Sequence, residues 1–146
     1  MMELKPITYA NIQDFDGTEY EAMSREDREK LIEESLNRTH KGAYFEFLAV
    51  YEGDAVVGFM NLFAHSAHII SCGPEIKRCC QKKGLGFLAE SMALEYAKKK
   101  GYTIAVGDVA ENNAASIALH EKLGFELDRK YQNKQGRTVR IYIKAL

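Results

Sequence analysis

The sequence lacks an excess of charge of either sign. Its 146 residues carry 20 basic and 21 acidic side chains, which gives a formal net charge of −1. A protein whose main task is to coat nucleic acid or an anionic membrane needs a surplus of basic residues. We therefore expect neither nucleic acid nor a membrane among its partners, and any anion that it binds has to be held by local geometry.

Other absences narrow the class of protein further. No apolar run is long enough to span a bilayer, and residues 1–4 do not open a signal peptide. The three cysteines, Cys72, Cys79 and Cys80, lack the spacing of a disulfide framework or of a zinc site. The metal-binding pattern H-E-x-x-H is also absent. We expect reduced thiols, no metal ion and a cytoplasmic location.

The chain has no internal repeat, no low-complexity tract and no linker rich in Pro, Gly or Ser. Its composition, 46% hydrophobic and 28% charged, is that of an ordinary globular protein. The length fits one compact unit and leaves no room for a second. We expect residues 1–146 to form a single domain.

Hydrophobic periodicity predicts strands in the middle of the chain and alternating strands and helices in the second half. Expected strands cover residues 3–8, 45–51, 55–63, 68–76, 103–109, 125–131 and 138–143, and expected helices begin at Ser24, near Leu85 and at Asn112 or Asn113. Gly73-Pro74 predicts a bulge or an edge position, because proline cannot donate to a ladder. The strand–helix–strand unit implies one parallel pair in an otherwise antiparallel sheet, hence a mixed α/β or α+β fold.

The helix near Leu85 is predicted from a single apolar stripe. Leu85, Leu88, Ala89, Met92 and Tyr96 recur at helical spacing. We expect these five side chains to face the core.

A polar, glycine-containing segment stands just before this helix and is the most informative feature of the chain. We call residues 81–86 the glycine loop; its sequence is Gln81-Lys82-Lys83-Gly84-Leu85-Gly86. A helix start leaves about four backbone N–H groups without partners, and its dipole places partial positive charge there. Glycine lets the backbone approach a ligand closely. Together these properties predict an anion site suited to phosphates.

The two lysines of the glycine loop agree with an anion site but do not require one. Lys82 and Lys83 oppose the helix dipole unless a negative group lies nearby. They could equally be solvated loop residues.

Three phosphate-binding motifs compete for the glycine loop. A Walker A motif is absent. Residues 84–89 fit the dinucleotide pattern G-x-G-x-x-A, and Asp108 follows at about the right separation of twenty residues. In that fold, however, an apolar strand runs directly into the first glycine, whereas polar residues 78–83 intervene here. Too little chain follows Asp108 for the remaining parallel strands, so we reject the dinucleotide interpretation.

The third motif fits the glycine loop, and a second stretch of the chain supports the same interpretation. The glycine loop resembles the Q/R-x-x-G-x-G/A signature of the GCN5-related N-acetyltransferases (GNAT family). Residues 113–125, with the sequence N-A-A-S-I-A-L-H-E-K-L-G-F, resemble that family's N-x-x-A-x-x-L-Y-x-K-x-G-F segment. The resemblance covers the chain from residue 45 onward, and the first forty residues only by the order of their elements.

The resemblance implies a fold and a cosubstrate. The fold is a single, mostly antiparallel twisted sheet with helices on both faces, whose central parallel strands splay into a V-shaped cleft that holds acetyl-CoA. The backbone of residues 82–86 would hold the pyrophosphate, the strand ending at Ile76 would pair with the pantetheine arm, and residues 72–76 would flank the thioester. The implied cofactor-binding residues are Ile76, Gln81, Lys82, Lys83, Gly84, Leu85, Gly86, Asn113 and Ser116.

The implied chemistry is direct attack of a primary amine on the thioester, which needs a proton acceptor and a proton donor. Many relatives place the donor at the tyrosine of the second motif, where this chain has His120. His120 could protonate the thiolate, or it could be a helix residue without a catalytic role. Glu75 or His68 could accept the amine's proton through water, or each could be an ordinary strand or loop residue.

These inferences favour an N-acetyltransferase for a small-molecule or peptide amine. The acceptor would be selected by residues 17–23, by the helix that begins near Ser24 and by the turn at 133–136. A CoA-binding sensor that has lost catalysis is the alternative, and the missing tyrosine supports it. A dimeric interaction protein is a third possibility, and a homodimer is possible in any of these cases.

Overall fold

The computed structural model describes all 146 residues, which form one mixed sheet and several helices. Strands are β1 (Met2–Pro6), β2 (Thr39–His40), β3 (Ala43–Glu52), β4 (Ala55–Ala64), β5 (Ile69–Ile76), β6 (Ile104–Ala110), β7 (Glu126–Gln132) and β8 (Thr138–Ala145). The α-helices are α1 (Arg25–Leu36), α2 (Leu85–Lys99) and α3 (Ala114–Lys122), and the short 3₁₀ helices are η1 (Tyr9–Phe15) and η2 (Arg78–Cys80). None of the helices has both the length and the apolar character needed to cross a membrane.

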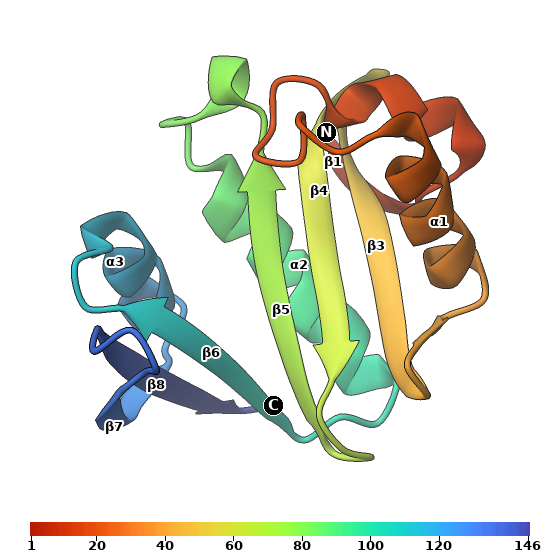
Figure 1. The fold of residues 1–146 in the computed structure, drawn as a ribbon. Coiled ribbons are helices and arrows are strands. Elements are labelled where there is room, and N and C mark those ends of the chain that lie inside the picture. The colour runs from red at the N-terminus through yellow and green to blue at the C-terminus, as the bar shows by residue number, and fades with distance from the viewer.

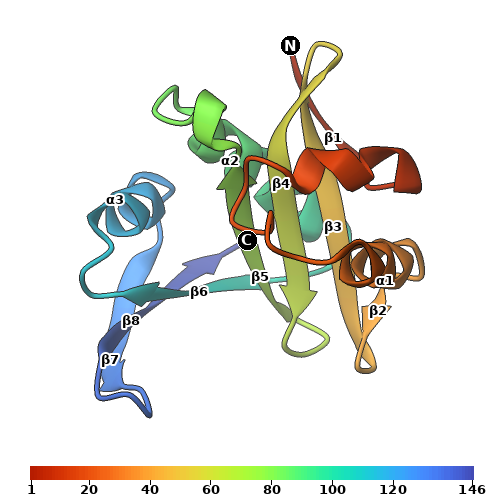
Figure 2. The ribbon, with the colours of Figure 1, turned by 45° about the horizontal axis from the view of Figure 1, so that its top comes forward.

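The sheet divides into two parts that share one short junction. Its strand order is β1-β3-β4-β5-β6-β8-β7, and only β5 and β6 run parallel. These two strands pair at just two positions, Ile69 with Ile104 and Ile70 with Ala105. Beyond them the strands diverge toward the ends that carry α2 and α3 (Figures 1 and 2). The expected mostly antiparallel sheet with splayed central strands is confirmed.

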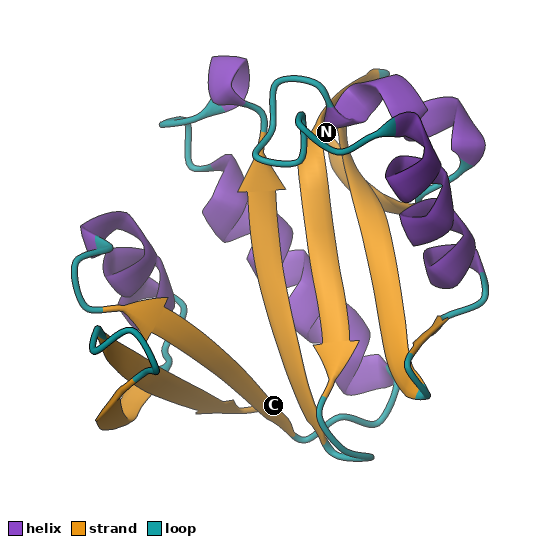
Figure 3. Cartoon of the chain, viewed as in Figure 1, coloured by secondary structure: helices purple, strands orange, loops and turns teal.

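Helices cover both faces of the sheet, as expected (Figure 3). On one face α1 and η1 pack on an aromatic cluster that includes Phe15, Phe47 and Phe59. The opposite face carries α2 over a larger cluster, which includes Leu62 and Ile70. Burying both faces leaves the diverging ends of β5 and β6 as the place where the sheet itself is open.

The buried face of α2 differs from the predicted stripe. Leu88 is 49% exposed and Met92 37% exposed, so these two residues do not belong to the core. The buried positions of the helix are Leu85, Ala89, Glu90, Ala93, Leu94 and Ala97. Leu85 and Ala89 of the predicted stripe are buried and Tyr96 packs against the core, so the prediction is wrong for Leu88 and Met92 only. Alanines at the other buried positions let the helix lie close to the sheet.

Pro74 occupies an edge position, and the strand has no bulge there. The register between β4 and β5 is continuous through Pro74 and its partner Met60. The backbone N–H of Lys77 donates to Val57 O at 2.8 Å. Along an antiparallel pair, successive residues point their backbone groups alternately toward and away from the partner strand, so the nitrogen of Pro74 points away from β4. No ladder bond is therefore missing, and the same alternation turns the backbone groups of Cys72 and Ile76 toward the gap beside β6.

Capping residues set the helix boundaries that the sequence predicted. Ser24 Oγ accepts the N–H of Asp27 at the start of α1, and Asn113 Oδ1 accepts the N–H of Ser116 at the start of α3. The first strand ends earlier than expected because Thr8 caps η1, a helix that the sequence analysis did not predict.

The close approach of β4 to β5 predicts a position that tolerates only glycine. A Cβ at Gly58 would lie 2.3 Å from the carbonyl oxygen of Glu75, which is backbone and cannot swing away. We expect Gly58→Ala to lower the free energy of unfolding by about 2 kcal/mol or more in urea denaturation. Gly73→Ala is the control, because a Cβ there meets nothing within 4 Å; equal effects would contradict the clash.

Candidate active site

The open ends of β5 and β6 border a cleft of about 1220 Å³. Its walls come from β5, the glycine loop, the first turns of α2, β6 and α3. Of the residues predicted as site residues, the cleft brings together Glu75, Ile76, Gln81, Lys82, Gly84, Leu85, Gly86, Asn113, Ser116 and His120. Lys83 and His68 do not line it.

At one end of the cleft, the start of α2 has unpaired backbone N–H donors. Gly84 caps the helix in the left-handed region, with φ of 75°, and supplies no side chain to the cap. The first N–H bonded within the helix is that of Leu88, which donates to Gly84 O. The N–H groups of residues 85–87 therefore have no helical partner, and the helix dipole adds positive potential there. This is the geometry expected of an anion site.

The side chain of Gln81 ties the glycine loop to the strand before it. Its Nε2 donates to Ile76 O at 3.0 Å. A Cβ at Gly86 would meet only Pro74 and Ile76 side chains, at 3.8 and 3.9 Å. The protein's own packing therefore does not demand glycine at position 86, whereas a ligand that approaches the helix start would.

The ring of His120 forms part of the cleft wall and is fixed there by contacts with neighbouring residues. Its Nδ1 lies 2.7 Å from Ser116 O, and a carbonyl only accepts, so Nδ1 carries the hydrogen. Nε2 faces Gly107 so closely that a Cβ there would lie 2.4 Å from it. The ring packs against Phe125 and Tyr142, at 4.9 and 5.6 Å between centroids. With one nitrogen engaged and the other left as an acceptor, this geometry favours a packing role over proton donation.

Glu75 lies on β5, where the cleft meets the loop of residues 16–23. Its Oε1 accepts the backbone N–H of Glu19 at 3.2 Å. Burial raises the pKa of Glu75 to about 7, against the opposing effect of this backbone hydrogen bond. A carboxyl with such a pKa can accept and release a proton near neutrality.

His68 is placed away from this chemistry. The strand expected to include it begins instead at Ile69, and His68 stands in the exposed turn before β5. Its carbonyl accepts the N–H groups of Thr103 and Ile104, at the end of β5 opposite to the glycine loop. Of the two predicted proton acceptors, the structure brings only Glu75 to the cleft.

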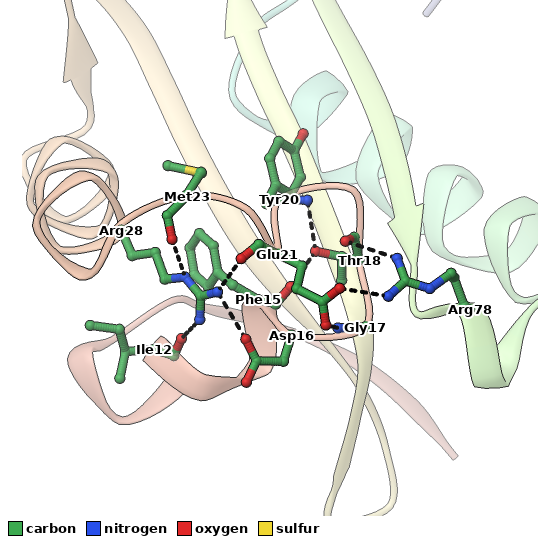
Figure 4. A network of polar contacts seen from close by, with 10 residues as sticks. All are labelled: Ile12, Phe15, Asp16, Gly17, Thr18, Tyr20, Glu21, Met23, Arg28 and Arg78. Atoms are coloured by element: carbon green, nitrogen blue, oxygen red, sulfur yellow. Dashed lines mark hydrogen bonds and ion pairs between the residues drawn. The ribbon is translucent and has the colours of Figure 1, made fainter.

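The loop of residues 16–23 is fixed by two arginines that the sequence did not single out (Figure 4). Arg28 of α1 donates to the carbonyl oxygens of Ile12, Glu21 and Met23 and to Asp16 Oδ1, at 2.8–3.2 Å. Its position in a charged helix gave no signal that it would be buried. This guanidinium holds together η1, the loop and α1.

Arg78 fastens the same loop to η2, beside the glycine loop. Its backbone N–H donates to Gly17 O at 2.8 Å, and its guanidinium donates to Thr18 O and Glu21 Oε2. The guanidinium of Arg78 also holds the pKa of Glu21 below its usual value. The loop beside Glu75 is thus anchored from two directions.

Comparison with known proteins identifies the family. The model of the acetyltransferase (GNAT) family matches residues 9–125, and the chain therefore belongs to this family. It is 35% identical over 71 residues to the L-methionine sulfoximine/L-methionine sulfone acetyltransferase of Pseudomonas aeruginosa. That match covers 48% of this chain and only 37% of the relative.

Solved structures share the fold at low sequence identity. A ribosomal L7/L12 α-N-protein acetyltransferase in complex with coenzyme A has a TM-score of 0.83 at 13% identity, over 99% of this chain and 94% of that one. A chimera of a spermidine N-acetyltransferase from Vibrio cholerae has a TM-score of 0.82 at 17% identity, over 98% and 95% of the two chains. These likenesses establish the GNAT fold.

The hydrogen bonds of Arg28 predict that replacing it destabilises the protein much more than replacing Arg25 of the same helix. Arg28→Lys keeps the charge but cannot make four directed bonds, so we expect a loss of about 2–3 kcal/mol in the free energy of unfolding. Arg25→Lys is the control, because Arg25 is exposed and makes a single ion pair with Glu29. Urea denaturation of both variants measures the difference; equal stabilities would show that the buried network contributes nothing.

Proposed function

We propose that the protein transfers an acetyl group from acetyl-CoA to a primary amine of a small molecule or peptide. The observation that carries the proposal is the cleft between β5 and β6, closed at one end by the unpaired N–H groups of the α2 start. Family membership and a coenzyme A-bound structure of the same fold support this cosubstrate.

The residues present fit acetyl-CoA along the length of the cleft. The N–H groups of the glycine loop and the first turn of α2 suit the pyrophosphate. The backbone groups of Cys72 and the N–H of Ile76 turn toward the gap beside β6 and can bind an extended arm in the manner of an added strand. Asn113 and Ser116 form the facing wall. Acetyl-CoA supplies the activated acyl group, and the protein supplies its position.

Glu75 is the proton acceptor in this proposal. A primary amine attacks only in its neutral form, and a carboxylate at the mouth of the cleft can take the proton, directly or through one water. Glu19 lies beside Glu75 in the same wall. The two acidic side chains favour the approach of a cationic amine, and the anchored loop of residues 16–23 borders the acceptor's path.

The acceptor class follows from chemistry common to the relatives. Their names describe acetylation of amino-acid derivatives, of spermidine and of a protein α-amino group, all of which present a primary amine. A release assay for free coenzyme A, run with methionine sulfone, spermidine and an unblocked peptide, tests the proposal. Turnover with any of them supports it. Binding of acetyl-CoA without turnover across a broad amine panel would favour the CoA-binding sensor instead.

Glu75→Gln tests the proton acceptor. We expect kcat to fall by roughly 100-fold, the usual scale of general base catalysis, with little change in the KM for acetyl-CoA. A base works only when deprotonated, so wild-type activity should rise with pH through about 7, the raised pKa of Glu75. This limb should disappear in the variant. Glu95→Gln, on the exposed side of α2, is the control; an unchanged pH profile in Glu75→Gln would remove Glu75 from the mechanism.

Gly86→Val tests the phosphate end of the cleft. A Cβ at this position has ordinary contacts only, so the variant should fold, while its methyl groups crowd the helix start. We expect the Kd for coenzyme A, measured by calorimetry, to rise at least about tenfold, which corresponds to about 1.4 kcal/mol. Met92→Val on the exposed side of the same helix should leave the Kd unchanged. A normal Kd in Gly86→Val would move the pyrophosphate away from this loop.

A further inference from the structure

Glu90 is a buried carboxyl with no partner. It lies in the second turn of α2 with 0% of its surface exposed, and neither of its carboxyl oxygens has a hydrogen bond. The other buried carboxyl on this side of the sheet, Glu46, accepts hydrogen bonds from Tyr44 and Tyr96. Leaving a buried polar group unpaired costs about 1–3 kcal/mol. The fold therefore carries an unsatisfied acid that its own packing does not explain.

The position of Glu90 links it to the cleft. Glu90 is among the residues that line it, four residues after Gly86 and hence on the same face of α2. Across from it stands Cys72 of β5, and the Glu90 charge contributes to raising the pKa of that thiol. Glu90 thus forms part of the inner wall, one helical turn below the donors proposed to hold the pyrophosphate. An acyl-pantetheine arm that runs along β5 passes this point.

The surroundings of Glu90 keep its proton in place. Burial raises the pKa of Glu90 to about 8, so the carboxyl is mostly protonated at neutral pH. Cys72 faces it from β5, and burial raises the pKa of this thiol to about 12, so it contributes no charge. Glu46 faces α2 from β3 but is engaged by its two tyrosines, and no lysine or arginine pairs with Glu90. The group is a neutral hydrogen-bond donor without an acceptor, buried in a residue that belongs to the cleft lining.

His120 and the tyrosines of the second half of the chain do not fill the role of acid. His120 stands where relatives have a tyrosine, but its Nδ1 hydrogen is bound to Ser116 O and its Nε2 faces Gly107. The tyrosines of the second half of the chain lie outside the cleft lining, namely Tyr96, Tyr102, Tyr131 and Tyr142.

We propose that Glu90 is the proton donor to the sulfur that leaves when the acyl group is transferred. This inference rests on the proposed function. As the amine nitrogen bonds to the acyl carbon, the carbon–sulfur bond breaks and its electron pair goes to sulfur. Glu90 gives its carboxyl proton to that sulfur, which leaves as a thiol. Glu75, having passed the ammonium proton to solvent before the attack, takes the second proton from the newly bonded nitrogen. Both carboxyls return to their starting states by exchange with solvent after the products leave.

Infrared difference spectroscopy tests the contact without turnover. The protonated carboxyl of Glu90 should give a C=O band that is absent in Glu90→Gln and that disappears as pH rises through about 8. This band should shift when coenzyme A binds and stay in place when desulfo-coenzyme A, which lacks the thiol, binds instead. An equal shift with both ligands, or no shift with either, would place the sulfur elsewhere and overturn the proposal.

Kinetics test the acid role itself. We expect Glu90→Gln to lower kcat roughly 100-fold with the Kd for coenzyme A nearly unchanged. An acid works only when protonated, so wild-type activity should fall as pH rises through about 8, and the variant should lose this limb while keeping the lower one that Glu75 sets. Glu95→Gln is the control. Wild-type kcat and pH profile in Glu90→Gln would overturn the proposal.

A second variant separates catalysis from folding. Burial opposes the charged form of Glu90, so the folded state loses stability, relative to an apolar replacement, as pH rises from the unfolded pKa of a glutamate through about 8. Glu90→Met should therefore have a higher Tm than the wild type, increasingly so toward pH 8, yet be as slow as Glu90→Gln. A stable Glu90→Met with full activity would show that the acid is dispensable. Failure of the wild type to bind coenzyme A would overturn the proposed function as well, whereas binding and turnover with unaffected Glu90 variants would overturn this inference alone.

Discussion

The site depends on how little of β5 is paired with β6. Two residue pairs, at Ile69 and Ile70, join the halves of the sheet, and beyond them the backbone polar groups of β5 lack a neighbouring strand on that side. A strand edge inside a protein is normally paired or covered, because unpaired backbone groups are costly when buried. Here α2 and α3 stand on either side of the gap instead of filling it. An extended ligand that pairs with β5 would satisfy those groups. The divergence of β5 and β6 therefore creates both the space for a ligand and the unpaired backbone groups that can bind it.

Burial sets the electrostatics of this gap. The formal net charge of the chain is only −1, so no strong overall field attracts an anionic ligand, and the helix start acts locally. Two carboxyls at the gap have raised pKa values, about 7 for Glu75 and about 8 for Glu90, with burial as the main cause in each case. The opposite roles that we propose for these two carboxyls rest on their positions, Glu75 beside the loop of residues 16–23 and Glu90 against Cys72.

Local chemistry explains which parts of the fold the sequence could predict. The caps at Ser24 and Asn113 follow from residue types at helix ends, and alternating apolar residues marked the strands. The buried face of α2 could be found only in part in this way, because three alanines pack closer to the sheet than Leu88 or Met92 would. The burial of Glu90 could not be predicted either, because charged residues of a helix are usually interpreted as its solvated face. The role of Arg28 was equally hidden, since its four acceptors come from η1 and the following loop.

The histidine at position 120 contributes to the shape of the cleft wall as well as to its chemistry. A buried histidine ring stacked on Tyr142 fits only because Gly107 of β6 leaves room at Nε2, where any Cβ would collide. Gly107 and His120 therefore depend on each other, and together they fill part of the wall that faces β5. The Nδ1 hydrogen of His120 is bound to Ser116 O, so the ring has no free donor on that side. In the proposed mechanism the proton for the leaving sulfur therefore comes from the wall that α2 supplies, where Glu90 has an unpaired carboxyl.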